Sequence, residues 1–196
     1  MEWLLLSTGF TGALTVLFLC RWVYRRLKTP LSLSVHFSPK GGCTDVIIQR
    51  IRHARHEVLV QAYSFSSKAI AEALVDAKTR GLNVDIILDR ANEQESYSEL
   101  TDLLGEGMNP LIDAEHAIAH NKVIILDSKT VITGSFNFTH QAEAENAENL
   151  IVIEGHPELA RAYRLNFLEH KAHAKPSERK KAKPPAAHRS EQKPAA

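Results

Sequence analysis

The feature that most restricts the fold of this chain is the alternation, from residue 33 to residue 169, of short apolar runs with segments of helical periodicity. Residues 58–63 and 84–88 have the length and the β-branched content of buried strands. Between these runs, Ser67 is a suitable helix N-cap and Gly81 a suitable helix end. The pattern predicts the α/β class, with a mixed β-sheet sandwiched between helices.

Further elements follow from the same rules. We expect a helix over residues 45–53 capped by Thr44, a helix over residues 97–104, and a last helix that Pro157 opens and that ends near residue 169. The other apolar runs predict strands over residues 33–37, 110–113, 123–126, 130–133 and 150–153. The turn at residues 127–129 predicts a hairpin between two of these strands.

Residues 3–20 carry no charged side chain, and eighteen residues of helix just cross a hydrocarbon core of roughly 30 Å. We therefore expect an N-terminal transmembrane helix that anchors the protein to a membrane. Cationic side chains follow directly, at Arg21, Arg25, Arg26 and Lys28. By the positive-inside rule they place the rest of the chain on the cytoplasmic side. A cleavable signal peptide, which would export the protein, is the alternative, although Glu2 and the lack of a small-residue cleavage site disfavour it.

The net charge of +1 conceals a segregation of charge along the chain. Residues 1–30 carry +3 and residues 171–196 carry +6, which leaves −8 on residues 31–170. The C-terminal stretch is rich in Lys, Pro and Ala and has little to bury, so it predicts a disordered basic tail that is either a solubilising appendage or a binder of polyanions. The expected organisation is an anchor with a basic flank, a folded domain and this tail.

Residues 120–137 contain polar side chains that can come together in one site. His120 and Lys122 are two residues apart, so in a strand their side chains point to one face. The hairpin can return Ser135 and Asn137 beside them, and Glu148 heads the next strand, where a carboxylate can orient an imidazole.

This set suits attack on a phosphodiester. A neutral imidazole is a competent nucleophile near neutral pH, and an ammonium with an amide stabilises the negative charge that gathers on phosphorus oxygens. The leaving alkoxide needs a proton from a second acid, normally another histidine.

The spacing H-x-K-x4-D, followed by six residues and G-S-x-N, resembles the signature of the phospholipase D superfamily. The matching residues are His120, Lys122, Asp127, Gly134, Ser135 and Asn137, with Glu148 in the place of a downstream acidic residue. The resemblance implies a phospholipase D-like catalytic domain over residues 31–170 and a phosphohistidine intermediate. The roles it implies are nucleophile for His120, phosphate ligand for Lys122 and Asn137, supporting hydrogen bonder for Ser135, and carboxylate behind the histidine for Glu148. Asp127 and Gly134 are expected to be structural.

The resemblance implies no metal and no other cofactor. A second copy of the motif is missing, because His173 and Lys175 keep its beginning but Lys180 stands where Asp is required. Members with one motif per chain pair two protomers, so we expect a homodimer with a shared active site on its twofold axis. The acids Asp113, Glu115, Glu143 and Glu145 are expected in solvated loops, and His116 at most at the rim of the site.

Two kinds of single-motif relative define the possible substrates. Nuc-type endonucleases cleave DNA and RNA, whereas the mitochondrial cardiolipin hydrolase and Zucchini group has an N-terminal anchor and is linked to phospholipid or single-stranded RNA. The charge of −8 on residues 31–170 opposes nucleic-acid binding. The sequence therefore predicts a membrane-anchored phosphodiesterase acting on phospholipid or nucleic acid. A non-catalytic membrane tether that retains the fold is the alternative.

Overall fold

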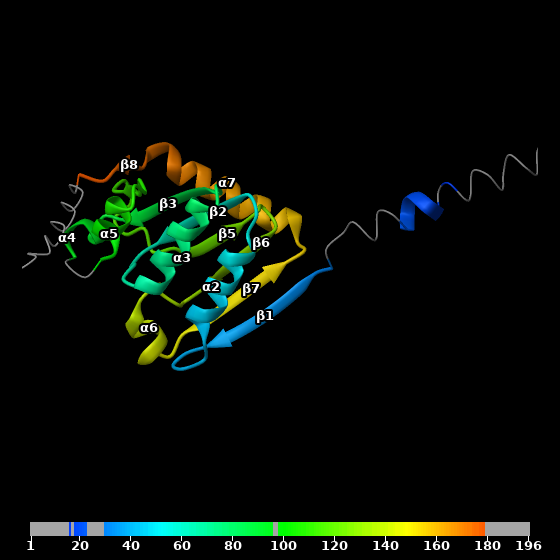
Figure 1. Cartoon of the computed structure of the whole chain (residues 1–196), viewed down its shortest axis with the longest axis horizontal. Helices are drawn as coiled ribbons and strands as arrows, with labels where there is room; N and C mark the ends of the chain where they lie inside the picture. The colour runs from blue at the N-terminus through cyan, green and yellow to red at the C-terminus, as the bar shows by residue number, and fades with distance from the viewer. Residues whose placement is uncertain (1–15, 17, 23–29, 96–97, 179–196) are drawn as a thin grey trace, which may run out of the picture.

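The computed structural model describes residues 16, 18–22, 30–95 and 98–178. Within these residues the body is one mixed sheet with helices on both of its faces (Figure 1). The strands lie side by side in the order β1-β7-β6-β5-β2-β3-β4-β8. The predicted fold class of a mixed β-sheet sandwiched between helices is confirmed.

The elements have the following bounds. The strands are β1 (Ser32–Phe37), β2 (Glu57–Ala62), β3 (Asn83–Asp89), β4 (Leu111–Asp113), β5 (Lys122–Leu126), β6 (Thr130–Gly134), β7 (Asn149–Glu154) and β8 (Lys175–Pro176). The helices are α2 (Cys43–His53), α3 (Lys68–Thr79), α4 (Ala91–Gln94), α5 (Leu100–Gly105), α6 (His140–Ala144) and α7 (Pro157–His173). Of these, α4, α6 and β8 were not predicted from the sequence.

The strand directions bring many strand ends together. Strands β2, β3 and β4 are parallel, whereas β5, β6, β7 and β1 alternate in direction along the other half of the sheet. As a result, the carboxyl ends of β2, β3, β4 and β6 meet the amino ends of β5 and β7 at one end of the sheet. We call this the site end.

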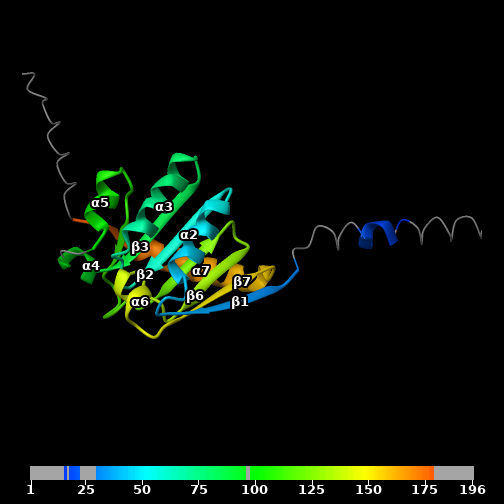
Figure 2. The same cartoon turned by 60° about the horizontal axis from the view of Figure 1, so that its bottom comes forward.

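Both faces of the sheet are buried. On one face, Ile47 of α2 and Leu74 of α3 pack with Val60 of β2 in a large apolar core. On the other, Phe167 of α7 packs with Leu59 of β2 in a smaller core. Figure 2 shows α2 and α3 together on one side of the strands and α7 on the other. Burial on both faces explains why the strands are continuous apolar runs instead of alternating ones.

The predictions made from local sequence signals were correct where the interacting residues are close in sequence. The Ser67 hydroxyl accepts a hydrogen bond from the backbone N–H of Ile70, as an N-cap does, and Gly81 follows α3 with φ 89°. The predicted hairpin joins β5 to β6, and its turn places Asp127 and Ser128 in the left-handed region at φ 53° and 52°.

The predicted cap of α2 was wrong. The helix begins at Cys43, and its N-cap is Gly42 at φ 74° without a side-chain cap. The backbone N–H groups of Gly42 and Thr44 donate instead to the carboxylate of Glu143, at 3.0 and 2.7 Å. Glu143 is therefore bound to α2 and does not lie in a solvated loop. A cap supplied from about 100 residues away leaves no local signal.

The expected boundary at residue 170 was also wrong. Helix α7 continues to His173, and β8 then pairs with β4. The Ser177 hydroxyl and the Glu178 backbone N–H both donate to Glu93 at 2.8 Å. Hydropathy gave no sign of this segment because main-chain pairing at a sheet edge needs no apolar side chain. The rest of the predicted tail, residues 179–196, lies outside the described residues.

Most of the predicted membrane span over residues 3–20 also lies outside the described residues. Residues 18–22 are helical and exposed. Within the described part of the chain, we find no helix with both the length and the apolar character needed to cross a membrane.

Candidate active site

His120 and Lys122 lie at the site end, where the loop after β4 enters β5. Lys122 is only 7% exposed, and its Nζ lies 3.0 Å from His120 Nδ1 and 3.0 Å from the His120 carbonyl oxygen. An ammonium group only donates hydrogen bonds, so Nδ1 is the acceptor in this arrangement. The other ring nitrogen, Nε2, has no hydrogen-bond partner among the described residues.

Tyr63, directly after β2, forms a wall beside these two residues. Its ring centroid lies 4.4 Å from that of His120 and 4.9 Å from Lys122 Nζ. The Tyr63 backbone N–H donates to the Asn121 carbonyl at 2.9 Å and so fixes the two segments together. From the sequence, Tyr63 was only the last residue of a strand, and its place beside the imidazole follows from the pairing of β2 with β5.

Gly134 and Ser135 join β6 to the start of β7. A Cβ on Gly134, whose φ is 152°, would lie 2.2 Å from the Asn149 carbonyl oxygen, so only glycine fits there. The Ser135 hydroxyl accepts hydrogen bonds from the backbone and side-chain N–H groups of Asn149, at 3.1 and 3.2 Å. Within this structure Ser135 thus holds the connection between two strands at the site end.

Asn137 lies in a segment with a fixed backbone. Its neighbours Phe136 and Phe138 are fully buried, and the Phe138 carbonyl accepts hydrogen bonds from the backbone N–H groups of Ser66 and Ser67. The Asn137 Oδ1 atom is buried and lacks a hydrogen-bond partner among the described residues. Its amide therefore has hydrogen-bonding capacity that the protein itself does not use.

Glu148, just before β7, is half-buried and acts on Lys122. Its Oε1 accepts a hydrogen bond from Asn146 Nδ2 at 3.2 Å, and among the described residues it makes no hydrogen bond to His120. Burial lowers the pKa of Lys122, and the Glu148 carboxylate opposes this by raising it. Among the described residues, Glu148 is the carboxylate that partly compensates the charge of the buried ammonium, and an anionic ligand would add to this compensation.

Asp127 lies at the opposite end of β5 from His120. Its carboxylate accepts hydrogen bonds from the backbone N–H groups of Arg55, His56 and Glu57, at distances from 2.7 to 3.2 Å. Burial acts to raise the pKa of Asp127, but these backbone hydrogen bonds outweigh it and lower the pKa. Its contacts are those of a residue that ties the segment before β2 to the hairpin.

The loop that carries His120 is held by Asp89, at the end of β3. The Asp89 side chain is buried, and it accepts hydrogen bonds from the backbone N–H groups of Ala119 at 2.7 Å and Ala91 at 2.8 Å. A hollow of about 350 Å³, lined in part by Tyr63 and Ile118, opens beside this loop. Sequence reasoning missed Asp89, although an acid at the carboxyl end of an apolar strand was the available signal.

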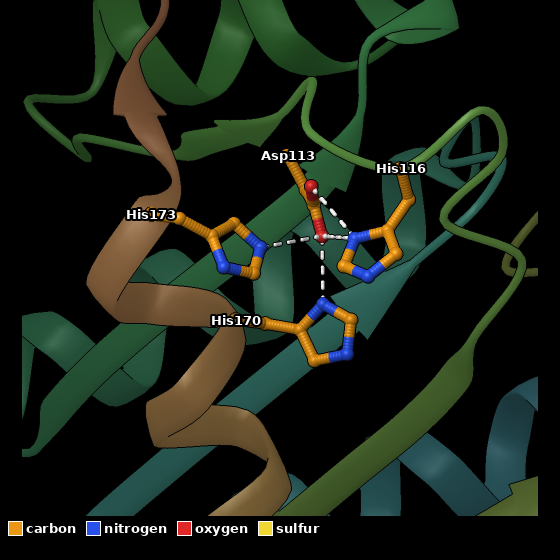
Figure 3. A group of neighbouring side chains, drawn as sticks. All are labelled: Asp113, His116, His170 and His173. Atoms are coloured by element: carbon orange, nitrogen blue, oxygen red, sulfur yellow. Dashed lines mark hydrogen bonds and ion pairs between the residues drawn. The ribbon is translucent and has the colours of Figure 1, made fainter.

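The sequence did not predict that a second set of polar side chains comes together. Asp113, at the end of β4, is surrounded by His116, His170 and His173, and Figure 3 shows the three rings converging on its carboxylate. Asp113 was expected in a solvated loop, yet its side chain is fully buried. The available signals were Asp113-x-x-His116 and His170-x-x-His173, two short spacings more than fifty residues apart.

Comparison with known proteins identifies the family. Residues 47–171 match the family model described as cardiolipin synthase, PLD-like domain. A phospholipase D of Rickettsia bellii is 48% identical over 140 residues, which are 71% of this chain and 69% of that protein. The chain belongs to the phospholipase D superfamily. The resemblance carried by the residue pattern is confirmed.

Other members of the superfamily agree in sequence and fold. A mitochondrial cardiolipin hydrolase of Danio rerio is 28% identical over 124 residues, which are 63% of this chain and 54% of that protein. Nuc from Salmonella typhimurium, a solved phospholipase D family member, superposes with a TM-score of 0.72 and 34% identity, over 76% of this chain and 99% of that chain. As a superfamily member of this group, the chain is a phosphodiester hydrolase.

Proposed function

We propose that this phosphodiesterase is anchored to a membrane and cleaves its substrate through a phosphohistidine on His120. The observation that carries the proposal is the Lys122 ammonium, which is 7% exposed and lies 3.0 Å from His120 Nδ1. A buried charge needs a partner to offset its desolvation, and Glu148 is the carboxylate that acts on it here. A substrate phosphate would supply the stronger partner.

The reaction takes two displacements at phosphorus. In the first, the lone pair of His120 Nε2 forms a P–N bond while the bond from phosphorus to the leaving alkoxide breaks. Nε2 must be unprotonated for this step, so the ring proton has to sit on Nδ1. A bound phosphate draws the Lys122 ammonium toward its oxygens and so releases Nδ1 from the hydrogen bond that it accepts now; the ring then loses its Nε2 proton to solvent and takes one up on Nδ1. In the second displacement, a water molecule gives a proton to the second histidine, which has just protonated the leaving alkoxide; the water oxygen attacks phosphorus, and the P–N bond breaks.

The equatorial oxygens of phosphorus gather negative charge in both steps. Lys122 provides a cation, and the amide of Asn137, whose Oδ1 has no partner among the described residues, turns its N–H groups to the substrate. Ser135 and Gly134 do not contact the substrate in this proposal; they hold in place the backbone that leads to Asn137.

The leaving alkoxide takes its proton from His120 of a second copy in a homodimer. An apolar stripe on the edge strand β1 supports this pairing: Leu33, Val35 and Phe37 are 62%, 51% and 64% exposed. The stripe ends at the site end, where the backbone N–H of Ser38 donates to the Glu148 carbonyl at 3.1 Å. A second copy that covers the stripe would therefore also lie beside the active site.

The substrate that we propose is a phospholipid. The uncharged residues 3–20 suit an anchor, and the charge of −8 over residues 31–170 repels nucleic-acid phosphates. Ile118, in the wall of the hollow beside Tyr63, is 61% exposed and can contact acyl chains or the bilayer surface. Single-stranded nucleic acid is the second candidate, supported by the similarity to Nuc and by the basic residues 179–196.

The test is hydrolysis by the full chain in detergent. Cardiolipin vesicles, phosphatidylcholine vesicles, single-stranded DNA and RNA are offered in parallel, together with the generic diester bis(p-nitrophenyl) phosphate. We expect hydrolysis of a phospholipid and of the generic diester, and loss of both in His120→Ala. The matched control is His53→Ala, an exposed histidine at the end of α2. Unchanged hydrolysis in His120→Ala would disprove the role of His120, and nucleic-acid cleavage alone would establish the second candidate.

A further inference from the structure

The group formed by Asp113, His116, His170 and His173, which we call the histidine cluster, joins three parts of the fold. Asp113 ends β4, His116 lies in the loop that leads to His120, and the other two histidines form the last turn of α7. The four side chains offer one ligand atom each, and these atoms lie within 4.8 Å of one another (Figure 3).

Three imidazole nitrogens converge on a single carboxylate oxygen. Asp113 Oδ2 lies 2.7 Å from His170 Nδ1, 3.1 Å from His116 Nδ1 and 3.3 Å from His173 Nε2. In a tetrahedral zinc site with bonds of about 2.0–2.1 Å, neighbouring ligand atoms are about 3.3 Å apart. The distances from Oδ2 to His116 and His173 are near this value, and all four ligand atoms lie within 4.8 Å of one another, so small side-chain movements would form a ligand shell.

One nitrogen of the cluster lacks a partner. His173 Nε2 is buried and makes no hydrogen bond of acceptable geometry among the described residues, although it lies 3.3 Å from Asp113 Oδ2. A buried nitrogen is normally paired, so an unpaired one aimed at an anionic oxygen indicates a missing ligand between them. A cation bound there would accept the lone pairs of the nitrogens and of the carboxylate together.

The surroundings complete the requirements of a metal site. Asp113 Oδ1 accepts a hydrogen bond from the Glu115 backbone N–H at 3.2 Å, which orients the carboxylate. A hollow of about 260 Å³, with Glu115 and Glu169 in its lining, gives a cation access from solvent.

We propose that the histidine cluster binds one zinc ion through Asp113, His116, His170 and His173. Three imidazoles and one carboxylate are a donor set that zinc prefers, whereas magnesium and calcium prefer oxygen ligands alone. Since all four positions are filled by protein, the site is structural. The ion ties the end of α7 to β4 and to the loop that carries His120. The proposal does not depend on the proposed chemistry of His120.

The experiment measures zinc bound to the full chain, produced without a polyhistidine tag. The protein in detergent is dialysed against a chelator, then against micromolar zinc, and its metal content is measured by atomic emission. We expect about one zinc per chain in the wild type and in His53→Ala. His116→Ala and His173→Ala should bind zinc at least about tenfold more weakly. Zinc should also raise the melting temperature of the wild type but not of these two variants.

Co²⁺ in place of zinc gives a readout that needs no variant. A tetrahedral site of nitrogen and oxygen ligands gives Co²⁺ an intense visible absorption, whereas a hexahydrated surface ion gives a weak one. We expect the intense band with one Co²⁺ per chain and its loss when zinc is added. Absence of zinc in the dialysed wild type, equal zinc in the wild type and both variants, or a weak Co²⁺ band would each overturn the proposal. His116 is 47% exposed in a loop, so His116→Ala keeps the fold.

Discussion

The two ends of β5 carry charged residues of one motif, Lys122 and Asp127, whose charges are satisfied in different ways. At one end, the buried Lys122 ammonium contacts an imidazole and an aromatic ring, and among the described residues it forms no direct ion pair. At the other end, the Asp127 carboxylate accepts hydrogen bonds from three consecutive backbone N–H groups. Spacing in the motif alone therefore does not tell a residue that supports the fold from one that is available to a ligand. We infer that Asp127, whose charge is satisfied by backbone N–H groups, supports the fold, and that Lys122, a buried charge without an ion partner among the described residues, is positioned for a ligand.

Substitution of Lys122 should have the largest effect on activity. Lys122→Met removes the cation that we propose stabilises the phosphorus oxygens, so we expect kcat for bis(p-nitrophenyl) phosphate to fall by about 100-fold to 1000-fold. The stability of the fold should stay the same or rise, because a buried charge is replaced by an apolar chain of similar length. Urea unfolding followed by circular dichroism measures the stability.

The matched control is Lys129→Met, on the exposed turn of the same hairpin. It should change neither kcat nor stability. If Lys122→Met unfolded the protein while Lys129→Met did not, Lys122 would be a structural residue and the contrast between the two ends of β5 would fail.

Substitution of Asp127 should give the reverse result. Asp127→Ala removes the acceptor of three backbone N–H groups, and we expect the free energy of unfolding to fall by about 2 kcal/mol. The kcat of the folded variant should stay within about twofold of the wild type, because Asp127 lies at the far end of the strand. Asp76→Ala, which removes an exposed ion pair with Arg80, should change stability by less than about 1 kcal/mol. A selective loss of kcat in Asp127→Ala would contradict this assignment.

The smallest effect that we expect is on the free energy of unfolding at acid pH, to which the Asp127 carboxylate contributes. Its pKa in the folded protein lies below the ordinary value of 3.8, so its charge stabilises the fold fully above that value. The contribution is lost as the pH falls through the folded pKa. The difference in unfolding free energy between the wild type and Asp127→Asn should therefore be constant above about pH 5 and shrink below it. Urea unfolding at a series of pH values measures the difference, and one that grows on acidification would refute the prediction.

The parts of the fold that could be predicted are those that depend on contacts between residues close in sequence. The i, i+2 spacing of His120 and Lys122, the hairpin turn at Asp127 and the cap at Ser67 each depend on contacts over a few residues. The apolar runs of the central strands were equally visible, because β2 and β5 are buried on both faces.

The parts that could not be predicted depend on contacts between distant segments. Glu143 caps α2 from about 100 residues away, and His170 meets Asp113 across 57 residues. Strand β8 is held by main-chain hydrogen bonds, to which its side chains give no clue. The position of Tyr63 against His120 likewise requires the order of strands in the sheet, which no local pattern contains.

The central claim, that His120 is the nucleophile, is tested most directly by trapping the covalent intermediate. The full chain is mixed with excess bis(p-nitrophenyl) phosphate, quenched within milliseconds in alkali, in which phosphohistidine is stable, and digested for mass spectrometry. We predict a nitrophenylphosphoryl group on the peptide that contains His120, in step with the first release of nitrophenol, and none in His120→Ala. Nitrophenol release with no modified peptide, or with the group on any other residue, would contradict the claim.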